Sequence, residues 1–469
     1  MAAPFPAHAY NWLEIGCGNG LSANALAACN TQAQFFAFDF NPTHILNAQK
    51  MASNAGLRNV HFFDDSFELA LKRNLPAMDY IVLHGIYSWI NRDNQQHILN
   101  LIAKLLKPGG VVYVSYNCLP GWASKTPVRH LMAELAARQG GDNAQKVTYI
   151  KEFMINLKDS TFQFVRNSSS SAAMIEKLLT QNANYLAHEY LNADWKPFYS
   201  NEIAQDMRSV KLSFAASATV IENADAANYD QASLEKFRQF HDSDMSELLK
   251  DFARNRQFRR DLFVKGKRAL SLQDIDEAKE TLHFVLIVPR SKCVLNVNVP
   301  LGNMDLSEQF YTPILDALID GAKSLGQLIA VVAAPPTVVL DVLLILIGVG
   351  YIHAASGAIS HEDLMSAKNF NRVALESNVR GEYIPVLVSP RLKAAFKISE
   401  INQYFLYFHL RSKEQLAPDV WALMKARGKS MSKEGVTLIA EEDNLRELSL
   451  AEARFKSEAL PLLTTFGMV

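Results

Sequence analysis

Glycines recur at every second position near the start of the chain, after a short apolar segment. That segment, NWLEI, contains strand-compatible residues, and Gly16, Gly18 and Gly20 follow it before a helical stretch that begins at Leu21. A strand, a glycine turn and a helix bring backbone N–H groups and the positive end of a helix to one ligand. Glycine also lets the backbone approach that ligand without a Cβ in the way. The chemistry indicated is small-molecule binding by the main chain.

The spacing of these glycines narrows the choice of ligand. The pattern is acid-x-Gly-x-Gly-x-Gly, with Glu14 two residues before the first glycine. A dinucleotide-binding loop needs glycine or alanine where this chain has Leu21, and no Gly-Lys-Ser/Thr follows to make a phosphate-binding loop. The next apolar strand, QFFAFD, ends in Asp39. An acid at that position is placed to bind two ribose hydroxyls.

Strand-like and helical segments alternate from the first strand up to Asn117. The strands predicted after the first are Gln34–Asp39, Asn59–Phe63, Met78–Leu83 and Val111–Tyr116, and a helix is predicted over Arg92–Leu106. Lys107–Gly110 (KPGG) has proline and glycine where a type II turn places them. This alternation predicts an α/β fold with a parallel, doubly wound sheet. Ligands of such sheets bind at the carboxyl ends of the strands.

Polar and aromatic residues follow the ends of the later predicted strands. They are Asp64, Asp65, Ser66 and Phe67 after the third, His84, Tyr87 and Trp89 after the fourth, and Asn117 and Trp122 after the fifth. Aromatic faces attract cations, and a partly desolvated pocket lowers the pKa of an amine. One wall of a pocket could be formed by Tyr87, Trp89, Tyr116, Asn117 and Trp122. The alternatives stay open: Trp89 and Trp122 as core residues, and His84 as a general base or a structural histidine.

A mostly helical stretch follows Trp122 and runs to about Asn201, with Ala172–Tyr190 predicted as one helix. After it, Lys211–Val220 and Asp261–Lys265 are predicted as the last strands of the sheet, with an amphipathic helix over Met245–Arg256 between them. The helical stretch is therefore interpreted as an insertion over the strand ends, where an acceptor must enter.

A separate region begins at about Ala269. His283–Pro289 and Cys293–Val299 suggest a strand pair, and three short helices follow, in an order that resembles a winged helix. The third of these helices, PTVVLDVLLIL, has no Lys or Arg to contact phosphates or base edges. A protein-interaction or scaffolding role is therefore favoured over specific nucleic-acid binding. More helical sequence is predicted beyond Ser360.

Composition excludes several classes of function. The formal net charge is -1, so the whole chain has no general attraction to nucleic acid or membrane. The most apolar run, Thr337–Ile352, contains Asp341 and is too short for a membrane span, so a buried helix is predicted. The 4 cysteines are scattered without metal-binding spacing, which suits a reducing cytoplasm. A cytoplasmic protein is expected.

Two further features have an ordinary interpretation. His188-Glu189 looks like the start of a zinc motif, but Asn192 occupies the place of its second histidine, so no metal is expected.

A run of basic residues could bind an acidic partner, although a solvated surface is the favoured interpretation. Its members are Arg254, Arg256, Arg259, Arg260, Lys265, Lys267 and Arg268.

The glycine pattern resembles motif I of class I S-adenosylmethionine-dependent methyltransferases. Further stretches resemble a bacterial group of these enzymes with an appended regulatory domain, which includes rickettsial-type protein lysine methyltransferases. They are HGIYSWI at 84–90, SYNCLPGW at 115–122, AHEYLN at 187–192 and NRQFRRDLFVKG at 255–266. Relatives usually carry a helical segment before the first strand, whereas this chain begins almost at that strand. The resemblance spans most of the chain.

The resemblance implies a Rossmann-like methyltransferase sheet with a helical insertion and a mostly helical C-terminal region that is partly winged-helix-like. The predicted domains are an S-adenosylmethionine-binding core over residues 1–122 and 206–268, a helical or regulatory insertion over 123–205, and the C-terminal region over 269–469. A homodimer is also implied.

The resemblance further implies roles for individual residues. The cofactor's amino-acid part is expected at Glu14 and the loop of Gly16, Gly18 and Gly20, its ribose at Asp39, and its adenine at Asp65, with Asp64 as the competitor, and near Ser66 and Phe67. His84 is a candidate for both cofactor binding and catalysis. Tyr87, Trp89 and Asn117 are the other catalytic candidates.

The expected function is methyl transfer from S-adenosylmethionine, with the lysine side chain of a protein as acceptor. The resemblance alone selects lysine, because the residues would allow another nitrogen or an oxygen. Two alternatives stay open: a methyltransferase for a small metabolite, and a non-catalytic S-adenosylmethionine-binding regulator.

Overall fold

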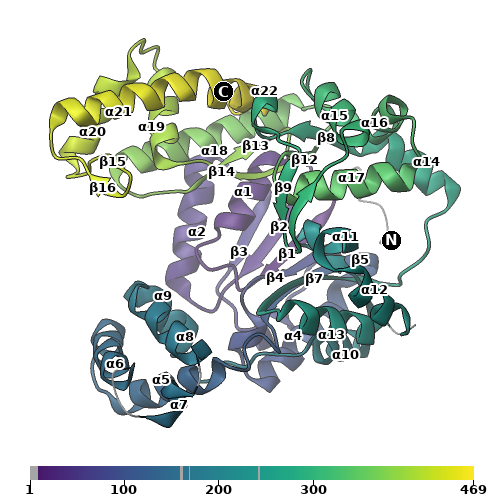
Figure 1. Cartoon of the computed structure of the whole chain (residues 1–469), viewed down its shortest axis with the longest axis vertical. Helices are drawn as coiled ribbons and strands as arrows, with labels where there is room; N and C mark the ends of the chain where they lie inside the picture. The colour runs from purple at the N-terminus through teal and green to yellow at the C-terminus, as the bar shows by residue number, and fades with distance from the viewer. Residues whose placement is uncertain (1–8, 159–161, 168, 241–242) are drawn as a thin grey trace. The chain divides into compact units, whose positions relative to one another are not determined.

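The fold was analysed in a computed structural model that describes residues 9–158, 162–167, 169–240 and 243–469. Its main sheet has seven strands in the order β3-β2-β1-β4-β5-β7-β6 (Figure 1). The strands are β1 (Asn11–Ile15), β2 (Gln34–Phe38), β3 (Val60–Phe63), β4 (Met78–Leu83), β5 (Leu106–Asn117), β6 (Leu212–Ser217) and β7 (Phe258–Lys265). The last strand of this sheet along the chain, β7, runs antiparallel to β5 and β6. The predicted Rossmann-like α/β class is confirmed.

Strand β5 begins earlier than the sequence predicted. Met78 pairs with Leu106 but Tyr80 pairs with Val111, so the KPGG segment bulges out of the strand. Gly109 has φ 80°, the value that a type II turn requires at its third residue. The predicted turn is therefore part of a bulge within β5 and does not precede the strand.

The chain forms two compact units, and each is described by itself. The first comprises the described residues of Met1–Ser66, Thr219–Asn228 and Arg268–Val469, and the second comprises those of Phe67–Ala218 and Tyr229–Lys267. The three-part division predicted from the sequence follows functional segments and stays a prediction.

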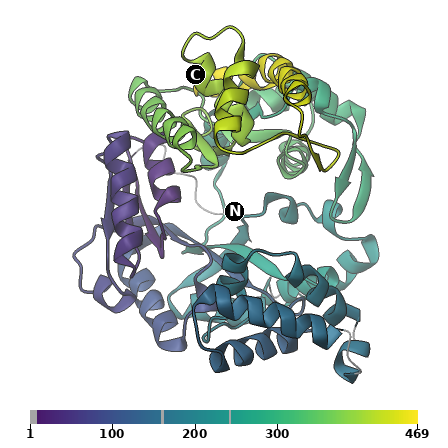
Figure 2. The same ribbon diagram turned by 90° about the vertical axis from the view of Figure 1, so that its left-hand side faces the viewer.

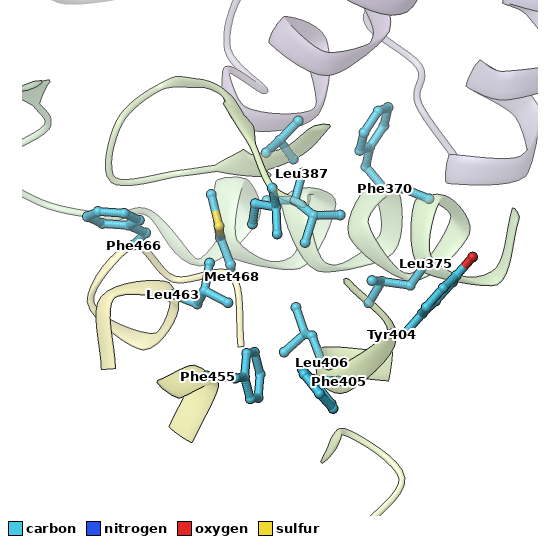
Figure 3. Close-up of a cluster of buried hydrophobic side chains, with 14 of the residues drawn as sticks. Phe370, Leu375, Leu387, Tyr404, Phe405, Leu406, Phe455, Leu463, Phe466 and Met468 are labelled. Atoms are coloured by element: carbon cyan, nitrogen blue, oxygen red, sulfur yellow. The ribbon is translucent and has the colours of Figure 1, made fainter. Parts of the chain in front are cut away.

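In the first unit the C-terminal region packs directly on the helices that follow β1 and β2. Helix α18 (His361–Arg380) lies against α1 (Leu21–Cys29) and α2 (Pro42–Ala55), as Figure 2 shows. Ala25, Ala28 and Cys29 of α1 belong to one buried cluster with side chains from residues 367–468. Figure 3 shows the C-terminal members of this cluster pointing toward one another. The helix behind the glycine loop is thus fixed by the chain's last hundred residues.

Polar contacts reinforce this packing at the C-terminal end of α1. The carboxylate oxygen Oδ1 of Asp363 accepts hydrogen bonds from the N–H and hydroxyl of Thr31 at 2.9 and 3.0 Å. Its Oδ2 pairs with Lys393 Nζ at 2.5 Å and accepts the Ser360 hydroxyl proton at 2.6 Å. Asp363 is 3% exposed, so these partners offset the cost of burying its charge.

The strand pairing in the C-terminal region differs from the prediction. Strand β8 (His283–Leu286) pairs with β11 (Lys323–Ser324) and β12 (Ile352–Ala355). Strand β9 (Asn296–Val299) pairs with β10 (Gly302–Asp305) through a two-residue connection, which favours an antiparallel hairpin between neighbours in the chain. The predicted pairing of 283–289 with 293–299 is therefore wrong.

The predicted short helices are present as α15 (Glu308–Ala317), α16 (Leu325–Val332) and α17 (Pro336–Gly348). Val339, Leu343 and Leu346 of α17 are buried in a core of the first unit. Within the described residues, only α16 and α17 taken together reach the length and apolar composition of a membrane span, and they are bent by 109°. The winged-helix resemblance stays a prediction.

The helical insertion belongs to the second unit. Its helices are α5 (Thr126–Arg138), α6 (Asn143–Lys158), α7 (Gln163–Arg166), α8 (Ser169–Leu179), α9 (Ala183–Tyr190) and α10 (Ser200–Ser209). The prediction of a single helix over Ala172–Tyr190 is wrong, because α8 ends at Leu179 and α9 begins after its N-cap residue, Asn182. The Asn182 side chain accepts the Tyr185 N–H at 2.8 Å, which is an N-cap.

Two members of the basic run are buried, which differs from the solvated surface that was expected, whereas Arg260, Lys267 and Arg268 are exposed as expected. Arg259 is 1% exposed and Arg256 is 8% exposed. The Arg259 guanidinium donates to Asp261 at 2.9 Å, Asp251 at 2.7 Å and Glu247 at 2.8 Å. These carboxylates lie on β7 and on α13 (Ser243–Arg254), a distribution that no local charge pattern reveals. Arg259 therefore ties α13 to the sheet of the second unit.

Candidate functional site

The three glycines of the predicted loop adopt a backbone conformation that favours glycine. Gly16, Gly18 and Gly20 all have positive φ, at 73°, 53° and 68°. The Gly16 N–H donates to the Phe38 carbonyl at 2.8 Å, which ties the loop to β2. A Cβ on Gly20 would lie 2.5 Å from Ala48 Cβ. The loop is therefore closely packed against α2 at Gly20, and its geometry depends on glycine.

This close packing predicts different costs for two alanine substitutions. Gly20→Ala should lower the free energy of unfolding by about 2–4 kcal/mol, because overpacking adds to the left-handed backbone cost. Gly18→Ala is the matched control, since a Cβ there meets nothing within 4 Å; it should cost only about 1 kcal/mol. Urea denaturation measures both. Equal losses would contradict the contact with Ala48.

Asp39 lies just beyond the end of β2, as predicted, and joins the glycine loop to the start of α2. Its Oδ2 accepts the Gly18 N–H at 2.9 Å. Its Oδ1 accepts the Asn41 N–H at 2.9 Å and lies 3.1 Å from His44 Nδ1. Asp39 is 8% exposed. The carboxylate is thus held in place at the carboxyl end of the strand, where a ribose contact was expected.

Glu14 presents an unsatisfied acceptor beside this loop. It is 5% exposed, and its Oε2 has no hydrogen-bond partner among the described residues. Burial raises the pKa of Glu14 to about 8, although a backbone N–H at Ala23 lowers it. A buried carboxyl oxygen without a partner from the chain suits a polar group of a ligand. The loop and Glu14 therefore fit the amino-acid part of S-adenosylmethionine.

The two acids after β3 have different environments. Asp65 is 8% exposed, whereas Asp64 and Ser66 are exposed. Phe40 was not among the predicted residues, and its side chain is 76% exposed directly after Asp39. A large, exposed aromatic face beside an acid at a strand end suits stacking with a planar base. In the sequence, its position immediately after Asp39 could have marked it as a candidate for cofactor binding.

The remaining predicted residues lie in the second unit. Phe67 begins the short helix α3 (Phe67–Ala70). The exposed His84 lies after β4, with Nδ1 2.8 Å from the Tyr113 hydroxyl. Partial burial, and then Arg260, lower the pKa of His84. The imidazole is therefore neutral near pH 7 and can act as an acceptor or a donor, depending on its tautomer.

Tyr87 lies in a 3₁₀ turn, η1 (Tyr87–Trp89), and is fully buried. Its hydroxyl donates to Asp206 Oδ2 at 2.7 Å, and Arg92 makes two contacts of 2.8 Å with the same carboxylate. Burial, and then Asp206, raise the pKa of Tyr87 well above its usual range. These contacts fix Tyr87 as an anchor of the turn. Its catalytic role stays a prediction.

Hydrogen bonds join η1 to the end of β5 and to the insertion. The Asn117 N–H donates to Ser88 Oγ at 2.9 Å. Asn192 Nδ2 donates to the carbonyl of the half-buried Trp89 at 3.1 Å. Asn117 Nδ2 donates to Glu189 Oε1 at 3.2 Å. Three sequence stretches that resemble the methyltransferase group, HGIYSWI, SYNCLPGW and AHEYLN, therefore meet within this unit.

The predicted residues thus fall into two sets. Glu14, the three glycines, Asp39, Asp65 and Ser66 belong to the first unit, and Phe67, His84, Tyr87, Trp89 and Asn117 belong to the second. Among the described residues, no group of three or more His, Cys, Asp or Glu side chains could hold a metal ion.

Two protein-family models match the chain. Residues 7–154 match the model of a methyltransferase domain, and residues 182–265 match a predicted methyltransferase regulatory domain. An uncharacterized protein of Synechocystis sp. is 38% identical over 464 residues, which is 98% of this chain and 91% of that protein. An uncharacterized protein of Rickettsia prowazekii is 32% identical over 191 residues, or 40% of this chain and 75% of that protein.

The solved structure of PKMT2 from Rickettsia typhi in complex with AdoHcy has the same fold. It matches with a TM-score of 0.66 and 20% identity, covering 97% of this chain and 98% of that one. The fold, the glycine loop and the matched domains define a methyltransferase. The chain belongs to the family of class I S-adenosylmethionine-dependent methyltransferases with a methyltransferase regulatory domain, and S-adenosylmethionine is its cofactor.

Proposed function

We propose that this methyltransferase acts on lysine side chains of a protein. The observation that carries the proposal is that Trp89, after β4, and Asn117, at the end of β5, are both joined by hydrogen bonds to the insertion. Asn192 donates to the Trp89 carbonyl, and Asn117 donates to Glu189 of α9. An aromatic, an amide and a carboxylate side chain suit an amine that carries a charge before it reacts. The family resemblance supports the choice of lysine over other amines.

The first set of residues is proposed to hold the cofactor, which supplies a methyl group activated on a sulfonium. Glu14 and the glycine loop would hold its amino-acid part, Asp39 its ribose, and Asp65 and Phe40 its adenine. Their role is to fix the methyl group for an in-line displacement. Such positioning can contribute about 7–11 kcal/mol to lowering the barrier.

Substitution of Asp39 tests the assignment of the ribose. Asp39→Ala should weaken S-adenosylmethionine binding by about 1.5–3 kcal/mol, or roughly 10- to 150-fold, because a charge-assisted hydrogen bond is lost. Isothermal titration calorimetry measures the affinity. Asp276→Ala is the control, since Asp276 is an exposed acid of the same unit paired with Lys279. Undiminished affinity of Asp39→Ala would contradict the assignment.

The second set of residues is proposed to receive the acceptor. A lysine amine has a reference pKa of about 10.4 and must lose a proton before it attacks. The half-buried Trp89 and the buried Asn117 would limit water around that amine, and the aromatic ring would tolerate a methylated cation. A homodimer in the cytoplasm, with a C-terminal region that contacts proteins and not nucleic acid, completes the proposal.

The test is methyl transfer from radiolabelled S-adenosylmethionine into a cell extract, separated into protein and small-molecule fractions. The proposal expects label in protein, with a matched reaction lacking enzyme as the control. Label only in small molecules would favour a metabolite methyltransferase. No transfer to either fraction would favour the non-catalytic regulator.

A further inference from the structure

We propose that Glu189 is the group that removes the proton from the acceptor amine, with Asn117 as the residue that orients it. This inference rests on the proposed function, since it takes the acceptor to be an amine. It assigns a role to Glu189, which had none once no metal was expected at the His188-Glu189 motif.

The position of Glu189 supports this role. It lies in the last turn of α9, in the insertion, while its partner Asn117 ends β5. The 3.2 Å hydrogen bond from Asn117 Nδ2 reaches only Oε1. Oε2 accepts no hydrogen bond from the residues that the structure describes, and Glu189 is partly exposed. One oxygen is thus held in position and the other is available to a ligand at a strand end, where acceptors of this fold bind.

A buried cation lies near Glu189. Arg129 of α5 is 6% exposed and its Nε has no partner among the described residues, while its guanidinium lies 4.8 Å from the Trp195 ring. Tyr190 and Trp195 pack into the same core. A buried positive charge disfavours a second cation nearby, so it favours a neutral amine once the proton has moved.

The protonation behaviour of Glu189 agrees with this geometry. Burial raises the pKa of Glu189, while the Asn117 hydrogen bond and Arg129 partly oppose that rise. Of the other titratable groups described nearby, Tyr185 and Tyr190 have raised pKa values and stay neutral, and Lys151 of α6 donates to the carbonyls of Leu179 and Gln181. A raised carboxyl pKa is closer to that of the amine, which improves proton transfer.

The proposed step is a proton transfer without any redox change. An N–H bond of the acceptor ammonium breaks, an O–H bond forms at Glu189 Oε2, and the electron pair stays on nitrogen as the lone pair that attacks the methyl carbon. Glu189 returns the proton to water after the methylated product leaves. No further reactant is needed.

Glu189→Gln separates this role from a merely structural one, because glutamine keeps an oxygen that can accept the Asn117 N–H but cannot take up a proton. We expect kcat/KM for a lysine-containing protein substrate to fall about 100-fold or more at pH 7, with unchanged S-adenosylmethionine affinity and melting temperature. We also expect the variant to regain activity about tenfold per pH unit as the amine loses its proton in solution, while the wild type changes little over that range.

Glu134→Gln is the matched control, since Glu134 is an exposed carboxylate of the same insertion that pairs with Arg138. It should leave kcat/KM unchanged. A Glu189→Gln variant with wild-type activity, or one whose lost activity does not return at high pH, would overturn the proposal. If the wild-type protein methylates no amine, the proposed function itself is wrong. This result is obtained with the wild type alone and is therefore distinct from a failure of the Glu189 proposal.

Discussion

Replacing Glu14 with glutamine is expected to raise the free energy of unfolding at pH 8 by about 3 kcal/mol. Keeping a carboxyl protonated when its pKa has moved from 4.5 to about 8 costs nearly 5 kcal/mol at about 1.36 kcal/mol per pKa unit. The buried amide of glutamine offsets roughly 1–3 kcal/mol of that gain. A residue that costs stability is often kept because it serves function. Since Glu14 is proposed to contact the cofactor, Glu14→Gln should also bind S-adenosylmethionine more weakly.

The effect of Glu14→Gln should depend on pH in a defined direction. Below the unfolded pKa of about 4.3 both states hold the proton, so Glu14 has no net cost. As pH rises toward 8, the unfolded chain releases the proton while the folded chain keeps it, so wild-type stability falls. Urea denaturation at pH 5 and pH 8 should show a larger gain at pH 8. A gain independent of pH would contradict the buried, protonated state, and the control Glu134→Gln, which removes an exposed carboxylate paired with Arg138, should give no gain at either pH.

Replacing Arg259 with methionine is expected to lower the free energy of unfolding by about 3–5 kcal/mol, since breaking a buried ion pair leaves uncompensated charge. The three carboxylates Glu247, Asp251 and Asp261 lose a shared partner, and Tyr116 alone still donates to Asp261, at 2.6 Å. Burial already raises the pKa values of Asp251 and Asp261 against the opposing effect of Arg259. The loss should therefore be smaller at acid pH, where these groups can take up protons.

Arg268→Met provides the control for this substitution. Arg268 also pairs with a carboxylate, Asp274, at 2.6 Å, but its side chain is 53% exposed. An exposed pair of this kind contributes roughly 0–1 kcal/mol. Chemical denaturation of both variants makes the comparison. Similar losses in the free energy of unfolding for the two variants would show that the buried network between α13 and β7 stabilises the protein no more than an exposed ion pair.

The sequence predicted the features that depend on local pattern. The alternation of apolar and helical segments predicted the α/β sheet, and the spacing of Gly16, Gly18 and Gly20 predicted a glycine turn between the first strand and its helix. The position of Asp39 was predicted because an acid that directly follows a strand must lie at the carboxyl end of that strand. These inferences need only residues that lie close together in the chain.

Features that depend on distant partners could not be predicted. The Asn117–Glu189 hydrogen bond joins residues 72 positions apart, and Glu189 carries no local signal except a broken zinc motif. Arg259 looks solvated because basic neighbours surround it in the sequence, although its three carboxylate partners bury it. The β9–β10 hairpin was missed because the short segment Gly302–Asp305 has little apolar character, so no alternation marks it as a strand.

The central claim is that this chain moves a methyl group from S-adenosylmethionine to the side-chain nitrogen of a protein lysine. Tandem mass spectrometry of proteins methylated with trideuteromethyl S-adenosylmethionine tests it most directly, because the fragment ions locate the label on one residue. We predict trideuteromethyl groups on lysine Nε, and far fewer of them with the Glu189→Gln variant at pH 7. Label confined to another residue type, or to small molecules, would contradict the claim.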